Sequence, residues 1–173
     1  MLNVIFYKTH CSSPIGNITL ASDGEHLIGL WFENQKYFCA SPYITLIENY
    51  DFEIFDHTKI WLNKYFKGER PEINKLLLAP IGNSFQQSVW KILCEIPYGK
   101  TISYGDIAKL IAKQRGITKM SAQAIGGAVG RNPIPIIIPC HRVIGSKGKL
   151  TGYATGIFVK AKLLEHEKAK FRF

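Results

Sequence analysis

The chain has 173 residues, of which 46% are hydrophobic and 20% are charged, a composition typical of a globular protein with a substantial core. No apolar run approaches the roughly 20 residues that span a bilayer. The N-terminus lacks the basic start, apolar stretch and small-residue cleavage site of a signal peptide. We therefore expect a cytoplasmic protein without membrane contact.

The net charge of +9 is concentrated in the second half of the chain. Residues 1–82 carry 7 Lys/Arg against 9 Asp/Glu, whereas residues 83–173 carry 15 against 4. Such an excess of cations is typical of a surface that binds a polyanion, because neutralising phosphates releases condensed counterions. On charge alone, a well-solvated cationic surface is the alternative.

The chain contains four cysteines without CxxC spacing, namely Cys11, Cys39, Cys94 and Cys140. In a reducing compartment they are free thiols, and the question is whether one is reactive. Cys11 and Cys39 could converge with His10 and His26 on zinc. Their spacing fits no familiar metal pattern, so we expect no metal site.

The first 82 residues are predicted to form a small α/β scaffold domain. Three β-like runs are expected, at residues 3–8, 17–22 and 26–32. Asp23 and Gly24, between the last two runs, are typical of a tight hairpin turn. Aromatic and aliphatic residues at helical spacing predict a helix over residues 58–67, ended by Gly68. Prolines and glycines then place the domain boundary after Gly82.

Residues 83–173 are predicted to form a mostly helical domain. Ser84 followed by Gln87 indicates a capping box at the start of one helix. Ser103 with Asp106 indicates the start of a second helix, and a third follows. Short helices joined by tight turns in a basic domain favour a helix-turn-helix, either plain or winged.

A third helix is predicted over about residues 118–129, and the run from Ser121 to Gly130 is almost all small residues. Its two internal glycines, Gly126 and Gly127, cost about 1 kcal/mol each relative to alanine. A helix without bulky side chains can enter the narrow minor groove of DNA, which would offset that cost. Tight packing within the protein is the alternative explanation.

Cys140 follows an apolar run marked by prolines, within residues 132–143. A cysteine in apolar surroundings is normally inert because burial raises its pKa, so a reactive Cys140 needs a base. The adjacent His141 could serve if a turn at Pro139 brings the two side chains to one side, since neighbours on a strand face opposite ways. A core cysteine beside a structural histidine is the alternative.

Glu167 is predicted to lie on the buried side of the last helix, because it follows Leu163 and Leu164 at helical spacing. A buried carboxylate needs a partner. If that partner is His141, Glu167 orients the imidazole while the other ring nitrogen takes the thiol proton. The alternative is a carboxylate at the helix edge that pairs with a lysine.

Taken in order, these motifs resemble the O6-alkylguanine-DNA alkyltransferases, also called methylated-DNA–protein-cysteine methyltransferases. The resemblance covers nearly the whole chain and rests on Ser13-Pro14-Ile15-Gly16, Ser103-Tyr104, the small-residue helix, Asn132-Pro133, Pro139-Cys140-His141-Arg142-Val143, Gly152-Tyr153 and Leu163-Leu164-Glu165-His166-Glu167. It implies an α/β fold class with an N-terminal ribonuclease-H-like domain and a C-terminal winged-helix-like, mostly α domain that carries the active site.

The resemblance implies DNA repair by direct reversal. An alkyl group would pass from O6 of guanine, and from O4 of thymine, to Cys140 in one irreversible SN2 step. The target nucleotide would flip out of the duplex, because a stacked O6 cannot be reached in line. The resemblance further implies no cofactor, a monomer, and double-stranded DNA bound through the minor groove.

The same resemblance assigns roles to individual residues. Cys140 would accept the alkyl group, His141 would act as base through a water, Glu167 would complete the relay, Asn132 would hold it in place, and Tyr104 would donate a proton toward N3 of guanine. Further residues would contact the substrate, namely Ser103, Gln123, Val143, Tyr153, Ala154 and Thr155. Others would contact the DNA, namely Ala122, Ala124, Gly126, Gly127 and Arg131.

Two positions depart from the family pattern. Gln123 stands where the family commonly has an arginine that fills the gap left by the flipped nucleotide, and glutamine lacks its charge and planar fork. We hypothesise that Gln123 still intercalates but holds the duplex less tightly. Thr155 stands where the family usually has glycine, and its branched side chain is expected to narrow the alkyl pocket.

Three other functions compete with this interpretation. A non-catalytic sensor of alkylated DNA is the nearest, but the acceptor cysteine is replaced in such relatives. A winged-helix transcription regulator would leave Cys140, His141 and Glu167 without a role. A cysteine hydrolase would turn over repeatedly, but the sequence offers it no obvious oxyanion hole.

Overall fold

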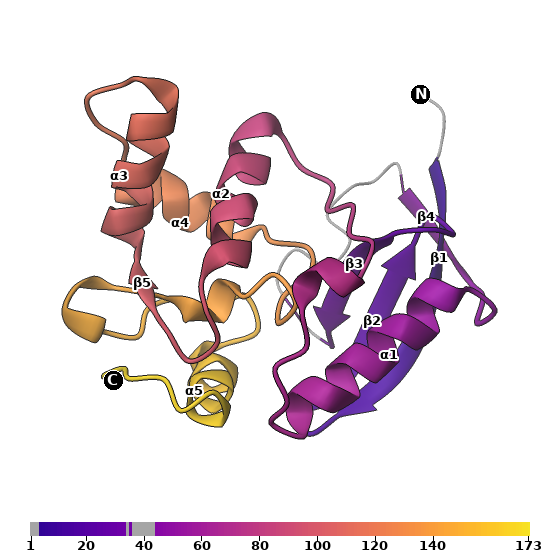
Figure 1. Cartoon of the computed structure of the whole chain (residues 1–173). Coiled ribbons are helices and arrows are strands. Elements are labelled where there is room, and N and C mark those ends of the chain that lie inside the picture. The colour runs from indigo at the N-terminus through magenta and orange to yellow at the C-terminus, as the bar shows by residue number, and fades with distance from the viewer. Residues whose placement is uncertain (1–3, 34, 36–43) are drawn as a thin grey trace. The chain divides into compact units, whose positions relative to one another are not determined.

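The structure is a computed structural model that describes residues 4–33, 35 and 44–173. It divides into two compact units, Met1–Ile81 and Gly82–Phe173 (Figure 1). The sequence placed this division one residue later, after Gly82. Among the described residues, no helix is long and apolar enough to cross a membrane.

The N-terminal unit contains a four-stranded mixed sheet in the order β3-β2-β1-β4. Its strands are β1 (Val4–Ser13), β2 (Gly16–Ser22), β3 (Leu27–Phe32) and β4 (Ile44–Glu48). The β1-β2 and β2-β3 pairs are antiparallel. The predicted hairpin joins β2 to β3, and Gly24 in its turn adopts a φ of 109°. β4 runs parallel to β1 and was not predicted.

Helix α1 (Glu53–Phe66) packs against β1, β2 and β3 (Figure 1). It begins earlier than the predicted residue 58, because Ile54 and Phe55 are buried in its first turn and extend the apolar face. A short 3₁₀ helix, η1 (Ile73–Lys75), follows. The fully buried Leu20, Leu27 and Leu30 of β2 and β3 belong to the core of this unit.

The C-terminal unit is mostly helical, as predicted. Its helices are α2 (Ser84–Glu95), α3 (Tyr104–Arg115), α4 (Ala122–Gly130) and α5 (Ile157–His166), with the 3₁₀ turns η2 (Cys140–Arg142) and η3 (Ser146–Gly148). Two short strands, β5 (Ile102–Ser103) and β6 (Val143–Ile144), pair in parallel.

Two predicted helix starts in this unit need correction. The capping box of α2 is formed by Asn83 and Gln86, one residue before the predicted Ser84 and Gln87. The Asn83 side chain accepts a hydrogen bond from the Gln86 backbone amide, and the Gln86 side chain accepts one from the Asn83 backbone amide, both at 2.9 Å. Helix α4 begins later than residue 118, because the Ser121 side chain caps it. The predicted Ser103 cap of α3 is confirmed.

Candidate active site

Cys140 lies in a buried segment that ends in a tight turn. Every residue from 134 to 144 is buried, and Cys140 itself is 5% exposed. Cys140 begins the η2 turn, which follows Pro139 and is closed by a bond from the Arg142 amide to the Pro139 carbonyl at 3.0 Å. The chain therefore does turn at Pro139, and consecutive side chains of η2 are not restricted to opposite faces of a strand.

The Glu167 carboxylate, at the end of α5, joins two side chains of η2. Its Oε1 lies 2.7 Å from His141 Nε2 and accepts from Arg142 Nη2 at 3.0 Å, while its Oε2 accepts from Arg142 Nε at 2.8 Å. The Gly99 amide also donates to Oε2, at 2.9 Å. The predicted pairing of His141 with Glu167 is therefore present, and the cationic partner is an arginine, not the lysine of the alternative.

Arg142 and Gly99 are structural supports that the sequence did not identify. Arg142 Nη1 donates to the Ile96 carbonyl at 2.6 Å, which fixes the guanidinium between α2 and Glu167. Gly99 has a φ of 73°, and a Cβ there would lie 2.8 Å from the Glu167 carbonyl oxygen. Only glycine therefore fits this turn without displacing the end of α5.

The charge states of the pair follow from burial and contacts. Burial raises the pKa of Glu167, but the hydrogen bonds and charges of His141 and Arg142 outweigh this and hold the pKa far below its ordinary range. Burial lowers the pKa of His141 more than the Glu167 carboxylate raises it, so the imidazole is neutral near pH 7. With Nε2–H directed at Glu167, Nδ1 is the free acceptor.

His141 Nδ1 is buried and has no hydrogen-bond partner within the part of the chain that the structure describes. A buried acceptor without a partner is costly, and such groups commonly bind an ordered water or take part in chemistry. The geometry therefore gives His141 one nitrogen that is fixed by a carboxylate and one that can receive a proton.

Burial raises the pKa of the Cys140 thiol, so at rest it is protonated. The nearby polar side chains of Asn132 and Tyr153, and the charge of Lys160, act on this pKa in the opposite direction. Asn132 is held rigidly, because Nδ2 donates to the Ile138 carbonyl at 2.8 Å and Oδ1 accepts from the Ile134 amide at 3.0 Å. The sequence placed Tyr153 near the guanine, and its influence on the thiol was not foreseen.

Lys160 is a buried cation beside this site, and the sequence reasoning missed it. The side chain is fully buried, Nζ donates to the Thr151 carbonyl at 2.9 Å, and Nζ lies 5.7 Å from the centre of the Tyr104 ring. Burial lowers the pKa of Lys160 to about 8. Lys160 stands at helical spacing before Leu163 and Leu164, the same signal that identified Glu167.

The remaining predicted substrate residues are arranged as follows. Tyr104 begins α3 and is half-buried, and burial raises its pKa. The Ser103 hydroxyl accepts from the Asp106 amide at 3.1 Å and donates to the Asp106 carboxylate at 2.6 Å, so it caps α3. Val143 is fully buried in β6, Ala154 is half-buried, and the buried Thr155 hydroxyl has no hydrogen-bond partner among the described residues.

The small-residue helix α4 has an open face. Its beginning, Ala122, Gln123 and Ala124, is exposed, whereas Ile125, Ala128 and Val129 pack inward. A Cβ at Gly126 would lie 3.9 Å from the nearest atom of a neighbouring residue and one at Gly127 would lie 3.7 Å away, which is ordinary contact. Packing within the described chain therefore does not require these glycines. Arg131 is exposed and bonds the Gly127 carbonyl at 3.5 Å.

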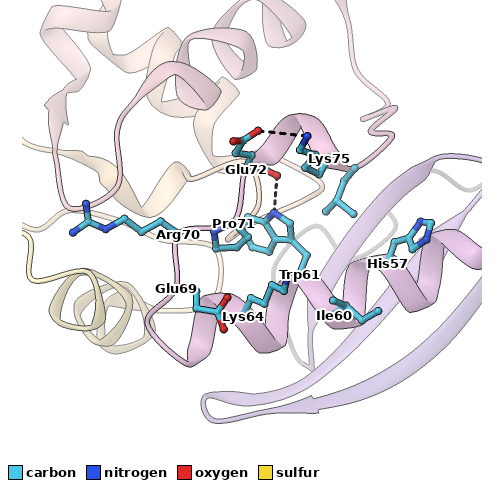
Figure 2. A pocket seen from close by; sticks show the side chains of 10 residues that line it. His57, Ile60, Trp61, Lys64, Glu69, Arg70, Pro71, Glu72 and Lys75 are labelled. Carbon is cyan, nitrogen blue, oxygen red and sulfur yellow. Dashed lines mark hydrogen bonds and ion pairs between the residues drawn. The ribbon is translucent and has the colours of Figure 1, made fainter.

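A cavity of about 460 Å³ lies in the N-terminal unit, beside α1 and η1 (Figure 2). The Trp61 indole at its centre donates to the Glu72 carbonyl at 3.0 Å, and Glu72 faces Lys75. None of the predicted site residues lines this cavity. The described residues contain no group of three or more His, Cys, Asp or Glu that could hold a metal, and Cys39 lies outside the described residues.

The fold and site together define a two-unit protein with a buried cysteine and a histidine–carboxylate pair in its helical unit. Residues 6–80 match the ribonuclease-like domain of 6-O-methylguanine DNA methyltransferase, and residues 84–169 match its DNA binding domain. The chain therefore belongs to the O6-methylguanine-DNA methyltransferase family. The expected fold class, an α/β ribonuclease-like domain followed by a helical DNA-binding domain, is confirmed.

Individual relatives agree over nearly the full length. The chain is 48% identical, over 96% of its length and 99% of the relative's, to the methylated-DNA–protein-cysteine methyltransferase of Methanosarcina barkeri. The crystal structure of the Mycobacterium tuberculosis O6-methylguanine methyltransferase is 45% identical, with a TM-score of 0.77 over 94% of this chain and 93% of that one. The M. tuberculosis protein in complex with DNA matches with 43% identity and a TM-score of 0.76, over 95% and 93% of the two chains.

Proposed function

We propose that this protein repairs DNA by moving a methyl or other alkyl group from O6 of guanine to its own Cys140, once per molecule. One observation carries the proposal: His141 shares a turn with Cys140, has Nε2 fixed by Glu167 at 2.7 Å, and has a buried, unpartnered Nδ1 within the described chain. This arrangement activates a thiol by removing its proton. The relatives' name, methylated-DNA–protein-cysteine methyltransferase, agrees with it.

The chemistry balances without a cofactor. The Cys140 proton passes to His141 Nδ1 through a bridging water, and Glu167 stabilises the resulting imidazolium. The thiolate sulfur attacks the alkyl carbon as the bond from that carbon to O6 breaks, and the bonding pair leaves with guanine. A proton supplied toward N3 from the Tyr104 hydroxyl makes guanine a better leaving group, and the proton held on His141 returns through water to restore that hydroxyl. The thioether that forms has no hydrolytic step, so the reaction ends there.

We propose that α4 enters the minor groove of the duplex. The exposed start of α4 and the glycines that internal packing does not require support this, because a narrow groove admits only a slim helix. A solved relative of 43% identity is described in complex with DNA. Gln123 would occupy the space that the flipped nucleotide leaves, and the same reaction would serve O4-alkylthymine. A monomer suffices, since the proposed chemistry uses residues of one chain.

The test is an intact-mass measurement after mixing the full-length protein with excess duplex containing O6-methylguanine. We expect a single gain of about 14 Da on the Cys140 peptide. Cys140→Ala should show no gain. Cys94→Ala is the matched control and should react normally, because burial raises the pKa of Cys94 to about 11. Tight binding to the lesion without a mass change would mean a sensor and overturn the proposed chemistry.

A further inference from the structure

One exposed stretch of the C-terminal unit carries cations that the proposed chemistry does not use. Residues 113–119, which we name the basic corner, run from the last turn of α3 into the connection to α4, and every one of them is exposed. Lys113, Arg115 and Lys119 give the basic corner three positive charges and no negative one. It lies within a span of 58 residues, 107–164, that contains ten Lys/Arg and no Asp or Glu.

The charges of the basic corner are not neutralised by the protein. Lys113 and Lys119 have no salt bridge or side-chain hydrogen bond within the described residues. Lys109, one turn earlier on α3, differs because it pairs with Asp106 at 3.1 Å. The Arg115 guanidinium lies over the Phe85 ring, 5.1 Å from its centre, which leaves its charge in place while fixing its position.

The backbone of the basic corner is ordered by helix-ending hydrogen bonds. Gly116 adopts the left-handed conformation at the end of α3, and the Ile117 amide donates to the Ala112 carbonyl at 3.0 Å. This is the hydrogen-bond pattern of a Schellman turn, which fixes the direction in which the chain leaves a helix. These bonds fix the backbone of the basic corner from Lys113 to Ile117.

The basic corner leads directly into the exposed start of α4. Lys119 stands two residues before Ser121, the residue that caps α4, and only the half-buried Met120 interrupts the exposed stretch that continues through Ala124. In Figure 1 the chain loops out from the end of α3 and returns to α4 within the same unit. The positive end of the α4 dipole adds to the same electrostatic field.

We propose that the basic corner binds backbone phosphates of the duplex beside the groove that α4 enters, with Lys113 and Lys119 each neutralising a phosphate. This inference rests on the proposed function, because it takes α4 as the helix in the groove. DNA is favoured over an acidic protein segment because the basic corner leads, across Met120 alone, into the exposed start of α4, the helix proposed to enter the groove. The contact is independent of base sequence and strengthens binding to damaged and undamaged duplex alike.

The test uses the full-length double variant Lys113→Gln, Lys119→Gln and undamaged duplex at several salt concentrations. Each lost phosphate contact lowers the slope of log affinity against log salt by about 0.9, so we expect a decrease of about 1.8 and an affinity at 0.1 M salt weaker by up to about sixtyfold. The matched control is Lys162→Gln, Lys170→Gln, which removes the same charge at two exposed lysines of the same unit. It should leave the slope within about 0.5 of the wild type.

A second measurement separates this inference from the proposed function. With saturating duplex containing O6-methylguanine, the single-turnover rate of alkyl transfer should be the same in the double variant and the wild type. If the wild type transfers no alkyl group, the proposed function fails. If transfer proceeds but the double variant keeps the wild-type salt slope, or if the control lowers the slope equally, the phosphate contact at the basic corner is wrong.

Discussion

Lys160 offers the sharpest test of the electrostatics of this site, because its charge has opposite effects on stability and on reactivity. It is fully buried, and burial lowers its pKa from the ordinary 10.5 to about 8. The folded protein therefore binds this proton less tightly than the unfolded chain does. Between the two pKa values, the unfolded chain holds more protons, so stability rises as the pH increases.

The magnitude follows from those two values. For a group with pKa 8 in the folded state and 10.5 in the unfolded state, the free energy of unfolding increases by about 2.5 kcal/mol between pH 7 and pH 10. Lys160→Met keeps the length and apolar stem of the side chain but cannot titrate. We expect the free energy of unfolding of Lys160→Met, relative to wild type, to fall by about 2.5 kcal/mol between pH 7 and pH 10. The loss of the bond to the Thr151 carbonyl adds the same cost at both pH values and does not affect this difference.

The assay is urea denaturation of both proteins at pH 7 and at pH 10, with Lys162→Met as the control. Lys162 lies on the same helix but is exposed, so Lys162→Met should follow the wild type within about 0.5 kcal/mol. A wild type and a Lys160→Met variant whose stabilities change in parallel with pH would refute the reasoning.

The same substitution should slow alkyl transfer. The charge of Lys160 lowers the pKa of Cys140, so its removal makes the thiolate harder to form. We expect a rate at pH 7 that is lower by roughly tenfold, equivalent to about 1.4 kcal/mol in the barrier. Rates over a range of pH should show the profile displaced to higher pH in Lys160→Met, whereas damage to the fold alone would lower the rate without displacing it.

Three further predictions concern single side chains. Glu167→Gln should cost about 3–5 kcal/mol of stability above pH 5, because Arg142 would keep a buried charge without its partner. Urea denaturation measures this cost. Because the pKa of Glu167 is held low in the folded protein, wild type should lose its advantage over the variant only as the pH falls below the ordinary pKa of 4.5. Thr155→Gly should raise the rate with benzyl relative to methyl substituents, whereas equal rates for both groups in wild type would contradict a narrowed pocket. Gln123→Arg should tighten binding to lesion-containing duplex, and an unchanged affinity would remove the hypothesis that glutamine holds the duplex less tightly.

The sequence predicted local structure and burial correctly where the signal depends on a few neighbouring residues. The Ser103 cap, the hairpin at Gly24 and the buried position of Glu167 were all predicted, because capping, positive φ and helical spacing each depend on a few neighbouring residues. The strand at residues 44–48 was missed, because it pairs in parallel with β1, far away in sequence. Its exposed and half-buried side chains give little hydrophobic signal.

The supports of the site were harder to predict because they come from distant parts of the chain. Arg142 next to His141 could be read as part of a motif, but its bonds to Glu167 and to the Ile96 carbonyl depend on tertiary structure. Gly99 is far from Glu167 in sequence, so its bond to the Glu167 carboxylate also depends on tertiary structure. Lys160 could have been found by the same helical spacing that identified Glu167. On that apolar helix face a buried carboxylate was considered, but a buried cation was not.

The site is built to resist thiolate formation at rest. Burial raises the pKa of Cys140 and lowers that of His141, and both changes favour the neutral thiol and the neutral imidazole. Glu167 partly restores the pKa of His141, and Lys160 and Asn132 partly lower the pKa of Cys140. The pair of Cys140 thiolate and His141 imidazolium is therefore accessible, although the neutral pair remains the ground state. A protein that is consumed by one alkylation benefits from this balance, because a neutral buried thiol is protected from other electrophiles until a substrate with a good leaving group is positioned beside it.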